Sequence, residues 1–411
     1  MRTTLPLLAL AAVLLAGPAA AQLGLPGVPL PPVDLPSGPL GRTLDGVTGT
    51  LHRTTERLLG LRTDRLDRLV RRHREVIELD ARGEPARRSE LLLLLDASPE
   101  VLAAVRSAGF EVAGTDEMGN LGFSIVRVAL PRGVSLAEGE AQLRRAAPTV
   151  EIVADNLHFQ TGASALPMLQ RSSAAAAMPA IATPVGIIDG APGAGQTVAA
   201  IRGFANGAPV ASHHGSAIAS LLSGAGARNL RVADIYGTDP AGGNALALVR
   251  ALDWLVGGGA RVISISLSGP NNAAVGKAIA AVRRKGAVVV APVGNDGPAA
   301  PPAYPASYPG VVAVTGVDGR NRVLLEAGQA LHLDYAAPGA DIGARDKSGK
   351  WREVRGTSYA VPLVAARAAA ALERGGSWQA ALDREAEDLG PRGTDERYGR
   401  GLLCGKCVRR R

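Results

Sequence analysis

From Pro184 onward, short and fully apolar segments alternate with longer segments in which apolar residues recur at helical spacing. Strands that are apolar along their whole length and separated by helices are typical of a parallel sheet covered by helices on both faces. The sequence therefore predicts an α/β domain over residues 184–403. The predicted strands are Val185–Ile188, Arg231–Tyr236, Val262–Leu267, Val288–Val293 and Val311–Val317, and the predicted helices are Ser216–Leu222, Ala245–Val256, Ala273–Lys285 and Ser358–Glu373.

Residues 88–158 have the pattern of a smaller α+β domain. Glu90–Asp96 includes five consecutive leucines and predicts a buried strand. Together with the five segments that follow, this strand gives the order β-α-β-β-α-β, which is that of a ferredoxin-like fold. These segments are a helix at Pro99–Ala108, strands at Phe110–Ala113 and Phe123–Leu130, a helix at Ser135–Ala146 and a strand at Val150–Asp155.

Two other segments flank this small domain. Within residues 22–87, a Pro-rich lead that disfavours helix precedes Thr43–Asp80, where leucines recur among arginines and predict one or two amphipathic helices. Residues 159–183 are small and almost uncharged, so we predict an exposed, unstructured linker. Such a linker is where proteolytic cleavage is expected.

The first 21 residues have the layout of a signal peptide. Arg2 precedes an apolar run, Leu5–Leu15, and the run is followed by Ala19-Ala20-Ala21. A membrane anchor needs about 20 apolar residues, and this run is shorter. No cysteine follows the run, which argues against a lipid anchor. We expect a protein that is exported to a periplasm or secreted from the cell, without a stable membrane anchor.

Composition and charge narrow the function further. The chain has 411 residues, of which 46% are hydrophobic and 20% charged, as in a globular protein of more than one domain. The net charge of +8 comes from residues 53–88, with 11 arginines against 7 acidic residues, and from four basic residues in the tail 404–411. The rest of the chain is balanced, and aromatic residues make up only 3%. Nucleic-acid binding is therefore not expected.

The two cysteines, Cys404 and Cys407, lie in the C-terminal tail. A redox Cys-x-x-Cys motif would open a helix after a strand. A zinc site would need two more ligands, and the only clustered candidates, His213 and His214, are adjacent and point apart. A local disulfide in an oxidising compartment is the favoured interpretation.

Three residues could carry nucleophilic catalysis. Ser358 opens an apolar, Ala-rich run, where unpaired N–H groups and the helix dipole would favour a developing negative charge. His214 could act as its general base, since imidazole titrates near neutrality. Asp189 ends an apolar strand, at the sheet edge where open α/β folds bind ligands. Taken singly, these residues could instead be a helix-capping serine, a packing histidine and a turn aspartate.

The residues around these three positions carry a resemblance to a known family. The matching motifs are Val185–Gly190 (VGIIDG), His214–Ala219 (HGSAIA), Gly294–Gly297 (GNDG) and Gly356–Pro362 (GTSYAVP). In sequence and order they resemble those of the subtilisin-like serine proteases, the peptidase S8 family, and Asp, His, Ser is the order found in subtilisin. The resemblance covers about residues 183–403.

The resemblance implies a role for each residue. Ser358 would be the nucleophile, His214 the general base and Asp189 the residue that orients the imidazole. Asn295 would donate to the oxyanion of the tetrahedral intermediate. The residues expected to bind substrate are Ser266, Leu267, Ser268, Gly269 and Gly294.

The resemblance also implies partners and an organisation. Protein or peptide substrates are expected, and the small domain would be an inhibitory propeptide that binds the catalytic domain of the same chain. We expect a monomer that needs no cofactor. Calcium sites are frequent in the family, but no acidic loop is dense enough to assign one.

The chain departs from the family pattern at five positions, 190, 191, 216, 217 and 268. Asp189 is followed by Gly190 and Ala191, where Asp-Thr-Gly or Asp-Ser-Gly is usual, so a hydroxyl beside the carboxylate is missing. Ser216 replaces threonine, Ala217 replaces a frequent second histidine, and Ser268 stands where glycine is common and is expected to narrow the cleft.

Two other functions compete with that of an exported serine endopeptidase made as a self-inhibited zymogen. A catalytically inactive subtilase fold that binds peptides would be favoured by loss of a catalytic residue, and none is lost. An α/β-hydrolase esterase requires Gly-x-Ser-x-Gly and the order Ser, Asp, His, neither of which the chain has.

Overall fold

The computed structural model describes residues 39–95, 98–160, 162–167 and 178–408. The predicted signal peptide and most of the Pro-rich lead lie outside these residues. The chain divides into two compact units, residues 1–53 and 54–411. The described part of the first unit is the start of helix α1 (Pro39–Arg72). One helix thus forms over most of Thr43–Asp80, and the prediction is wrong at its end, where Ile77–Leu79 is a strand that pairs with another strand. The second unit contains both globular domains.

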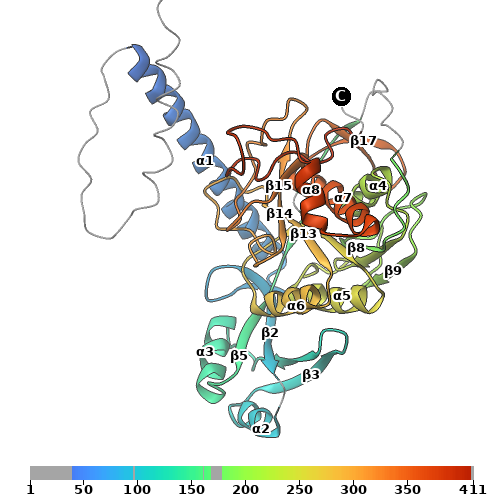
Figure 1. Ribbon diagram of the computed structural model, residues 1–411. Coiled ribbons are helices and arrows are strands. Elements are labelled where there is room, and N and C mark those ends of the chain that lie inside the picture. The colour runs from blue at the N-terminus through green and yellow to red at the C-terminus, as the bar shows by residue number, and fades with distance from the viewer. Residues whose placement is uncertain (1–38, 96–97, 161, 168–177, 409–411) are drawn as a thin grey trace, which may run out of the picture. The chain divides into compact units, whose positions relative to one another are not determined.

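A seven-stranded parallel sheet forms the centre of the large domain, as the apolar segments predict (Figure 1). Its strand order is β15-β14-β13-β11-β8-β10-β9, and each neighbouring pair is parallel. The strands are β8 (Val185–Asp189), β9 (Ala200–Gly203), β10 (Leu230–Asp234), β11 (Val262–Ile265), β13 (Val288–Pro292), β14 (Val312–Val317) and β15 (Tyr335–Pro338).

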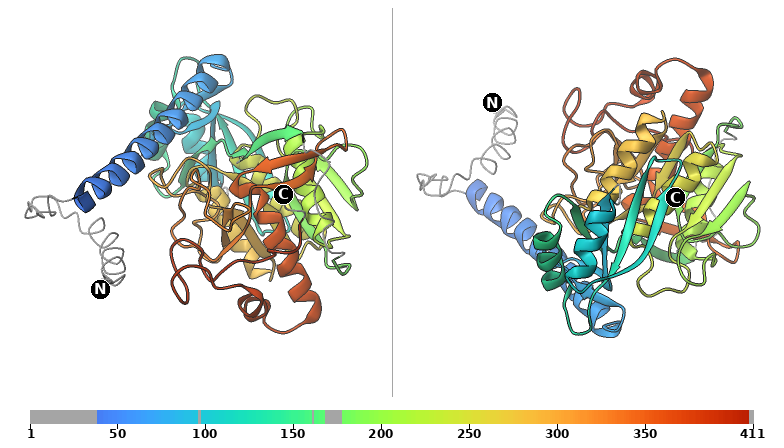
Figure 2. Two further views of the ribbon diagram at one scale, coloured as in Figure 1. Left: turned by 90° about the horizontal axis from the view of Figure 1, so that it is seen from above. Right: turned by 90° about the horizontal axis from the view of Figure 1, so that it is seen from below.

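Helices cover both faces of this sheet (Figure 2). Helices α4 (His213–Gly224) and α7 (Val361–Arg374) pack with Val185 and Ile187 of β8 in one core. On the other face, α5 (Ala245–Gly257) and α6 (Ala273–Arg284) pack with Ile188. The strands are buried on both faces, which is why they carry continuous apolar residues.

The small domain, residues 77–158, has the predicted ferredoxin-like order of strands. Its sheet runs β5-β2-β4-β3, with the added strand β1 beside β2. Helices α2 and α3 pack on one face. The elements are β1 (Ile77–Leu79), β2 (Pro85–Leu95), α2 (Pro99–Ser107), β3 (Glu111–Met118), β4 (Phe123–Ala129), α3 (Leu136–Ala146) and β5 (Glu151–Asn156).

The leucine run in β2 is buried because the small-domain sheet is covered on both sides. Leu91 and Leu93 face the core beneath α2 and α3, whereas Leu92 and Leu94 join the core of α5 and α6 in the large domain. Successive side chains of a strand point to opposite faces, so a strand between two cores needs no polar positions. The two domains therefore share a hydrophobic core.

The prediction of an unstructured linker at residues 159–183 is wrong at its start. Strand β6 (Phe159–Gln160) pairs antiparallel with β12 (Leu267–Ser268) of the large domain. Strand β7 (Ala163–Pro167) pairs with β17 (Trp351–Arg355), which also pairs with β16 (Ile342–Arg345). A strand that adds to the edge of another domain is held mainly by main-chain hydrogen bonds and needs few apolar side chains of its own. Its sequence can therefore look like that of a linker.

Two helix starts and several short elements differ from the sequence prediction. Helix α4 begins at His213 rather than Ser216, because Ser212 caps it by accepting a hydrogen bond from the Gly215 N–H. Ser358 lies in a 3-10 turn, η3 (Thr357–Tyr359), just before α7 rather than within it. Strands β9 and β15 to β17, and helix α8 (Trp378–Glu385), were not predicted.

Cys404 and Cys407 form a disulfide with each other, which confirms the local pairing favoured by the sequence. Both cysteines are buried in the core that contains α4 and α7. Within the described ranges, no group of three or more His, Cys, Asp or Glu side chains is placed to hold a metal ion. No helix in the described part of the chain is long and apolar enough to cross a bilayer.

Candidate active site

Three polar side chains meet in the interior of the large domain. His214 Nδ1 lies 2.7 Å from Asp189 Oδ2, and His214 Nε2 lies 3.0 Å from Ser358 Oγ. Asp189 and Ser358 are fully buried and His214 is 5% exposed. The structure therefore brings together the three residues that the sequence predicted, which lie 25 and 144 positions apart along the chain.

Each of these side chains is positioned by the end of an element. Asp189 is the last residue of β8, at the carboxyl edge of the parallel sheet. His214 lies in the first turn of α4, and its ring packs 5.1 Å from the ring of Tyr359. Ser358 follows Gly356, whose φ of 146° is a conformation that favours glycine and turns the chain into η3.

Asn295, predicted to be an oxyanion donor, contacts the residue before Ser358. Its Oδ1 accepts a hydrogen bond of 3.0 Å from the Thr357 N–H, and the Thr357 hydroxyl donates to the carbonyl of Gly294. Because Oδ1 is held by this N–H, the amide Nδ2 is oriented as the free donor end. Nearby, the buried Ser266 hydroxyl donates to the backbone carbonyl of Ser358.

Of the residues predicted to bind substrate, Ser268, Gly269 and Gly294 line a cavity, whereas Ser266 and Leu267 are fully buried. Leu267 pairs with Gln160 and Ser268 with Phe159, so β6 lies along β12 as an added antiparallel strand. A Cβ on Gly269 would meet the ring of His158 at 2.6 Å. A cavity of about 590 Å³ adjoins this strand pair. It is lined by residues that include Phe159, Ser268, Gly269, Gly294 and Asn295.

After β6 the chain passes the Ser358 hydroxyl. A Cβ on Gly162 would lie 2.8 Å from Ser358 Oγ and 2.6 Å from the ring of Tyr359, so only a glycine fits this position without displacing these atoms. On the other side, Gln160 Nε2 donates a hydrogen bond of 2.8 Å to Asp189 Oδ1. Sequence analysis missed Gln160 and Gly162, because a polar and a small residue in a Ser- and Ala-rich stretch have the composition of a linker.

His158, the residue before β6, is buried against the large domain. Its side chain is fully buried, and neither ring nitrogen makes a hydrogen bond with the described residues. Its carbonyl accepts from the Tyr236 hydroxyl. Burial lowers the pKa of His158 to about 4, and the nearby backbone of Asn156 and Gly243 opposes this shift only in part. His158 is therefore neutral in this state at neutral pH.

Strand β5 of the small domain faces the N-termini of α5 and α6. Asp155 Oδ1 accepts from the Leu246 N–H in the first turn of α5, where a carboxylate is favourable. Burial raises the pKa of Asp155 to about 7, although Arg87 lies 3.7 Å away. At α6, Asn272 donates to the carbonyl of Ala154.

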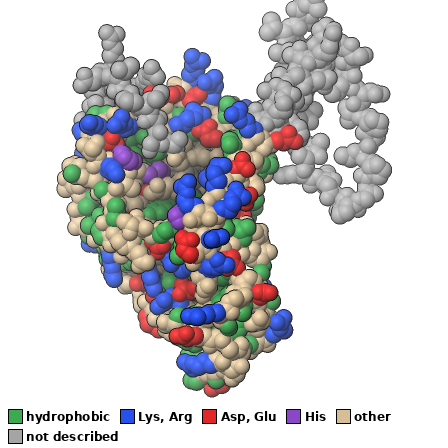
Figure 3. Space-filling model, turned by 180° about the vertical axis from the view of Figure 1, so that it is seen from behind, with side chains coloured by type: hydrophobic (Ala, Val, Ile, Leu, Met, Phe, Trp, Pro, Cys, Tyr) green, Lys and Arg blue, Asp and Glu red, His purple; other side chains and the backbone are tan. Residues whose placement is uncertain are grey.

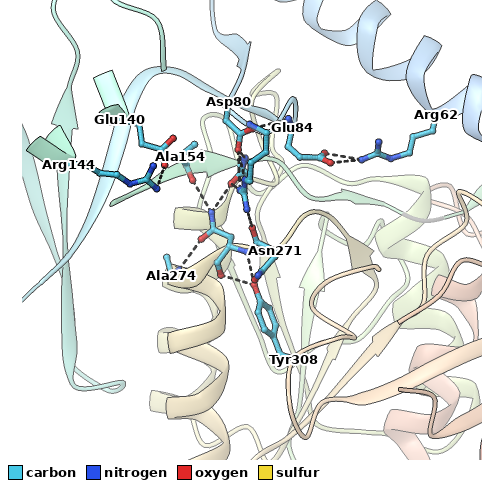
Figure 4. A network of polar contacts seen from close by, with 12 residues as sticks. Arg62, Asp80, Glu84, Glu140, Arg144, Ala154, Asn271, Ala274 and Tyr308 are labelled. Carbon is cyan, nitrogen blue, oxygen red and sulfur yellow. Dashed lines mark hydrogen bonds and ion pairs between the residues drawn. The ribbon is translucent and has the colours of Figure 1, made fainter. Parts of the chain in front are cut away.

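Polar contacts continue along the same junction. Figure 4 shows Ala154, Asn271 and Tyr308 close together there, and the Tyr308 hydroxyl donates to the carbonyl of Asn272. The Arg82 guanidinium donates to the carbonyl of Asn271. Further charged contacts across the junction include Arg87 with Asp239, Arg250 with Asp116, and Asp253 with the backbone of Asn120 and Leu121.

The junction is thus both apolar and charged. Charges of both signs are interspersed over the surface that Figure 3 shows. The buried leucines of β2 and the capped helices α5 and α6 hold the small domain against one helical layer of the large domain. The added strand β6 extends from there along β12 toward Ser358.

Comparison with known proteins gives matches over the large domain. The family model of the subtilase family, Peptidase_S8, matches residues 203–401, a range that includes His214, Asn295 and Ser358. Subtilisin from Bacillus pumilus is 31% identical over 162 residues, which are 38% of this chain and 59% of that protein. Subtilisin E from Bacillus subtilis (strain 168) is also 31% identical over 162 residues, covering 42% of its length. The chain thus spans less than two thirds of these relatives.

A solved structure matches over both domains. Fervidolysin from Fervidobacterium pennivorans, a keratinolytic enzyme related to subtilisin, aligns with a TM-score of 0.65 at 16% identity. The alignment covers 80% of this chain and 62% of that chain. At this identity the match shows a shared fold.

Proposed function

We propose that this chain, which belongs to the subtilase family, is a serine endopeptidase that cuts peptide bonds in protein substrates. The observation that carries this proposal is the unbroken contact from Asp189 through His214 to Ser358, at 2.7 and 3.0 Å. A buried carboxylate fixes the tautomer of the imidazole and stabilises the imidazolium that forms during the reaction.

Each step of the reaction uses one of these groups. As Ser358 Oγ attacks the substrate carbonyl, His214 Nε2 takes its proton and then gives it to the leaving amine. The Nδ2 of Asn295 and the N–H of Ser358 donate to the oxyanion, and the Asn295 amide alone contributes about 3 kcal/mol. Water then hydrolyses the acyl-enzyme at Ser358, with His214 as its base.

We further propose that the chain is made as a zymogen inhibited by its own small domain. Three contacts support this proposal: β6 occupies the edge of β12, Gly162 lies against Ser358, and the small domain buries apolar surface on α5 and α6. Substrates would bind along β12 in the same way, so the small domain and a substrate compete for one cleft. Cleavage beside Gly162 would be the maturation step.

Export and processing complete the proposal. Residues 1–21 would direct the chain out of the cytoplasm and be removed, leaving a protease that acts as a monomer in the periplasm or outside the cell. The disulfide between Cys404 and Cys407 supports an oxidising compartment.

Hydrolysis of an unfolded protein, such as reduced and alkylated casein, tests the activity. The wild-type chain is compared with Ser358→Ala and with His213→Ala, a control at the histidine that neighbours the base. We expect Ser358→Ala to lose at least ~10⁴-fold in rate and His213→Ala to stay within a few-fold of the wild type. No hydrolysis by any of the three proteins would favour the inactive, peptide-binding alternative.

A further inference from the structure

The carboxylate of Asp189 has two different partners at its two oxygens. Oδ2 contacts the imidazole of His214, and Oδ1 accepts from the Gln160 side chain at 2.8 Å and from the Gly190 N–H at 2.7 Å. Gln160 is the only one of these residues that belongs to the segment lying in the cleft. A carboxylate cannot donate, so the amide nitrogen of Gln160 must face it.

Residue 190, which follows Asp189, is a glycine and brings no side chain to this carboxylate. A Cβ on Gly190 would lie 2.5 Å from Ser212 Oγ and 3.5 Å from Gln160 Nε2. Ser212 cannot easily move, because its hydroxyl accepts from the Gly215 N–H and so caps α4 in the turn before His214. A serine or threonine at position 190 would therefore not fit, and the large domain supplies no side-chain hydroxyl beside Asp189 from this position. The side-chain donor to Asp189 Oδ1 comes instead from the strand that is paired with β12.

The register on β12 defines the position of that donor. Gln160 pairs with Leu267, and two residues later Gly162 lies against Ser358 Oγ. A peptide that binds in the same register places the side chain two residues before its Gly162 equivalent at Asp189. When a peptide adds to a sheet edge, the register of the pairing determines which site on the protein each of its side chains contacts.

We propose that Asp189 is also a specificity determinant, and that the protease selects substrates with glutamine at the position of Gln160. An uncharged amide satisfies the buried Oδ1 and leaves the negative charge of Asp189 available to the His214 imidazolium. An apolar side chain of similar length leaves Oδ1 short of one donor, and a glutamate places a second negative charge beside a buried carboxylate. This inference rests on the proposed protease activity and adds a substrate preference to it.

Peptide hydrolysis by the wild-type protein tests the preference without altering the enzyme. The parent peptide copies residues 157–164, Leu-His-Phe-Gln-Thr-Gly-Ala-Ser, between a fluorophore and a quencher. Two further peptides carry methionine or glutamate in place of the glutamine. We expect kcat/KM to fall at least ~10-fold for methionine, as for loss of a hydrogen bond to a charged group, and further for glutamate.

The same substitution in the full chain gives a second readout. Gln160→Met should slow the conversion of precursor to mature protein by a similar factor, whereas Gln379→Met, the same change on an exposed face of α8, should not. Equal kcat/KM values for the three peptides, with an enzyme that digests casein, would overturn the specificity inference alone. An enzyme that cleaves neither peptides nor casein would overturn the proposed function and the inference with it.

Discussion

Replacing His158 by leucine is expected to remove a large part of the acid sensitivity of the full-length chain. His158 is fully buried between the two domains, and neither ring nitrogen has a hydrogen-bond partner among the described residues. Its pKa is lowered from 6.5 to about 4 in the folded chain. Leucine fills a similar volume and does not titrate.

The sign of the effect follows from proton uptake. As the pH falls below about 6.5, the unfolded chain binds a proton at His158 and the folded chain does not until about pH 4, so stability is lost over that interval. Between pH 7.5 and 4.5 the two pKa values give a loss of about 2.5 kcal/mol from His158. Asp155 has the opposite effect on stability over much of the same interval, because its raised pKa means that the folded chain takes up a proton there before the unfolded chain does.

Comparison of two proteins isolates the contribution of His158. Both carry Ser358→Ala so that the chain stays intact, and one also carries His158→Leu. The free energy of unfolding in urea is measured at both pH values by circular dichroism. Because both proteins retain Asp155, the difference between their pH dependences belongs to His158.

We expect the leucine variant to gain about 2.5 kcal/mol relative to its parent on going from pH 7.5 to 4.5. A stability difference between the two proteins that is the same at both pH values would refute the reasoning. It would mean that His158 has a hydrated, ordinary environment in the folded precursor.

Three further predictions concern the neighbouring contacts. Asp155→Asn should steepen the loss of stability on acidification, since it removes the group that opposes His158: in the Ser358→Ala chain the free energy of unfolding in urea should fall by more between pH 7.5 and 4.5 than it does with Asp155 present. Asn295→Asp keeps an acceptor for the Thr357 N–H but loses the amide donor, so kcat should fall ~10²–10³-fold with KM little changed; a KM effect alone would contradict this role. Gly162→Val would place atoms within 2.8 Å of Ser358 Oγ, so the full-length chain should accumulate uncut. A second protease, added to remove the small domain, should still release an active enzyme. Unchanged maturation would contradict the position of Gly162.

The parallel sheet and the three catalytic candidates could be predicted because their signals are local. Strands buried on both faces, such as β8, are continuously apolar up to their polar end, here Val185–Ile188 before Asp189, and the residues after Gly356 and around His214 form recognisable motifs. The leucine run of β2 predicted a buried strand for the same reason, but the sequence did not indicate that its second face packs on α5 and α6.

What the sequence did not predict depends on contacts between distant segments. Residues 159–167 are mostly small and uncharged and show no strand periodicity, and their two strands form by pairing with the edges of β12 and β17. Gln160 looks like any exposed polar residue until the fold places Asp189 beside it. The start of α4 was misplaced because the capping role of Ser212 was not recognised.

The central claim is that Ser358 is the nucleophile of a protease that matures itself. Intact-mass measurement and N-terminal sequencing of the purified wild-type chain, beside Ser358→Ala, test it most directly. We predict that the wild type loses its small domain and begins at Gly162 or Ala163, while Ser358→Ala keeps the small domain. Identical cleavage of both proteins would show that another protease cuts the chain, and two intact proteins without activity on casein would contradict the claim.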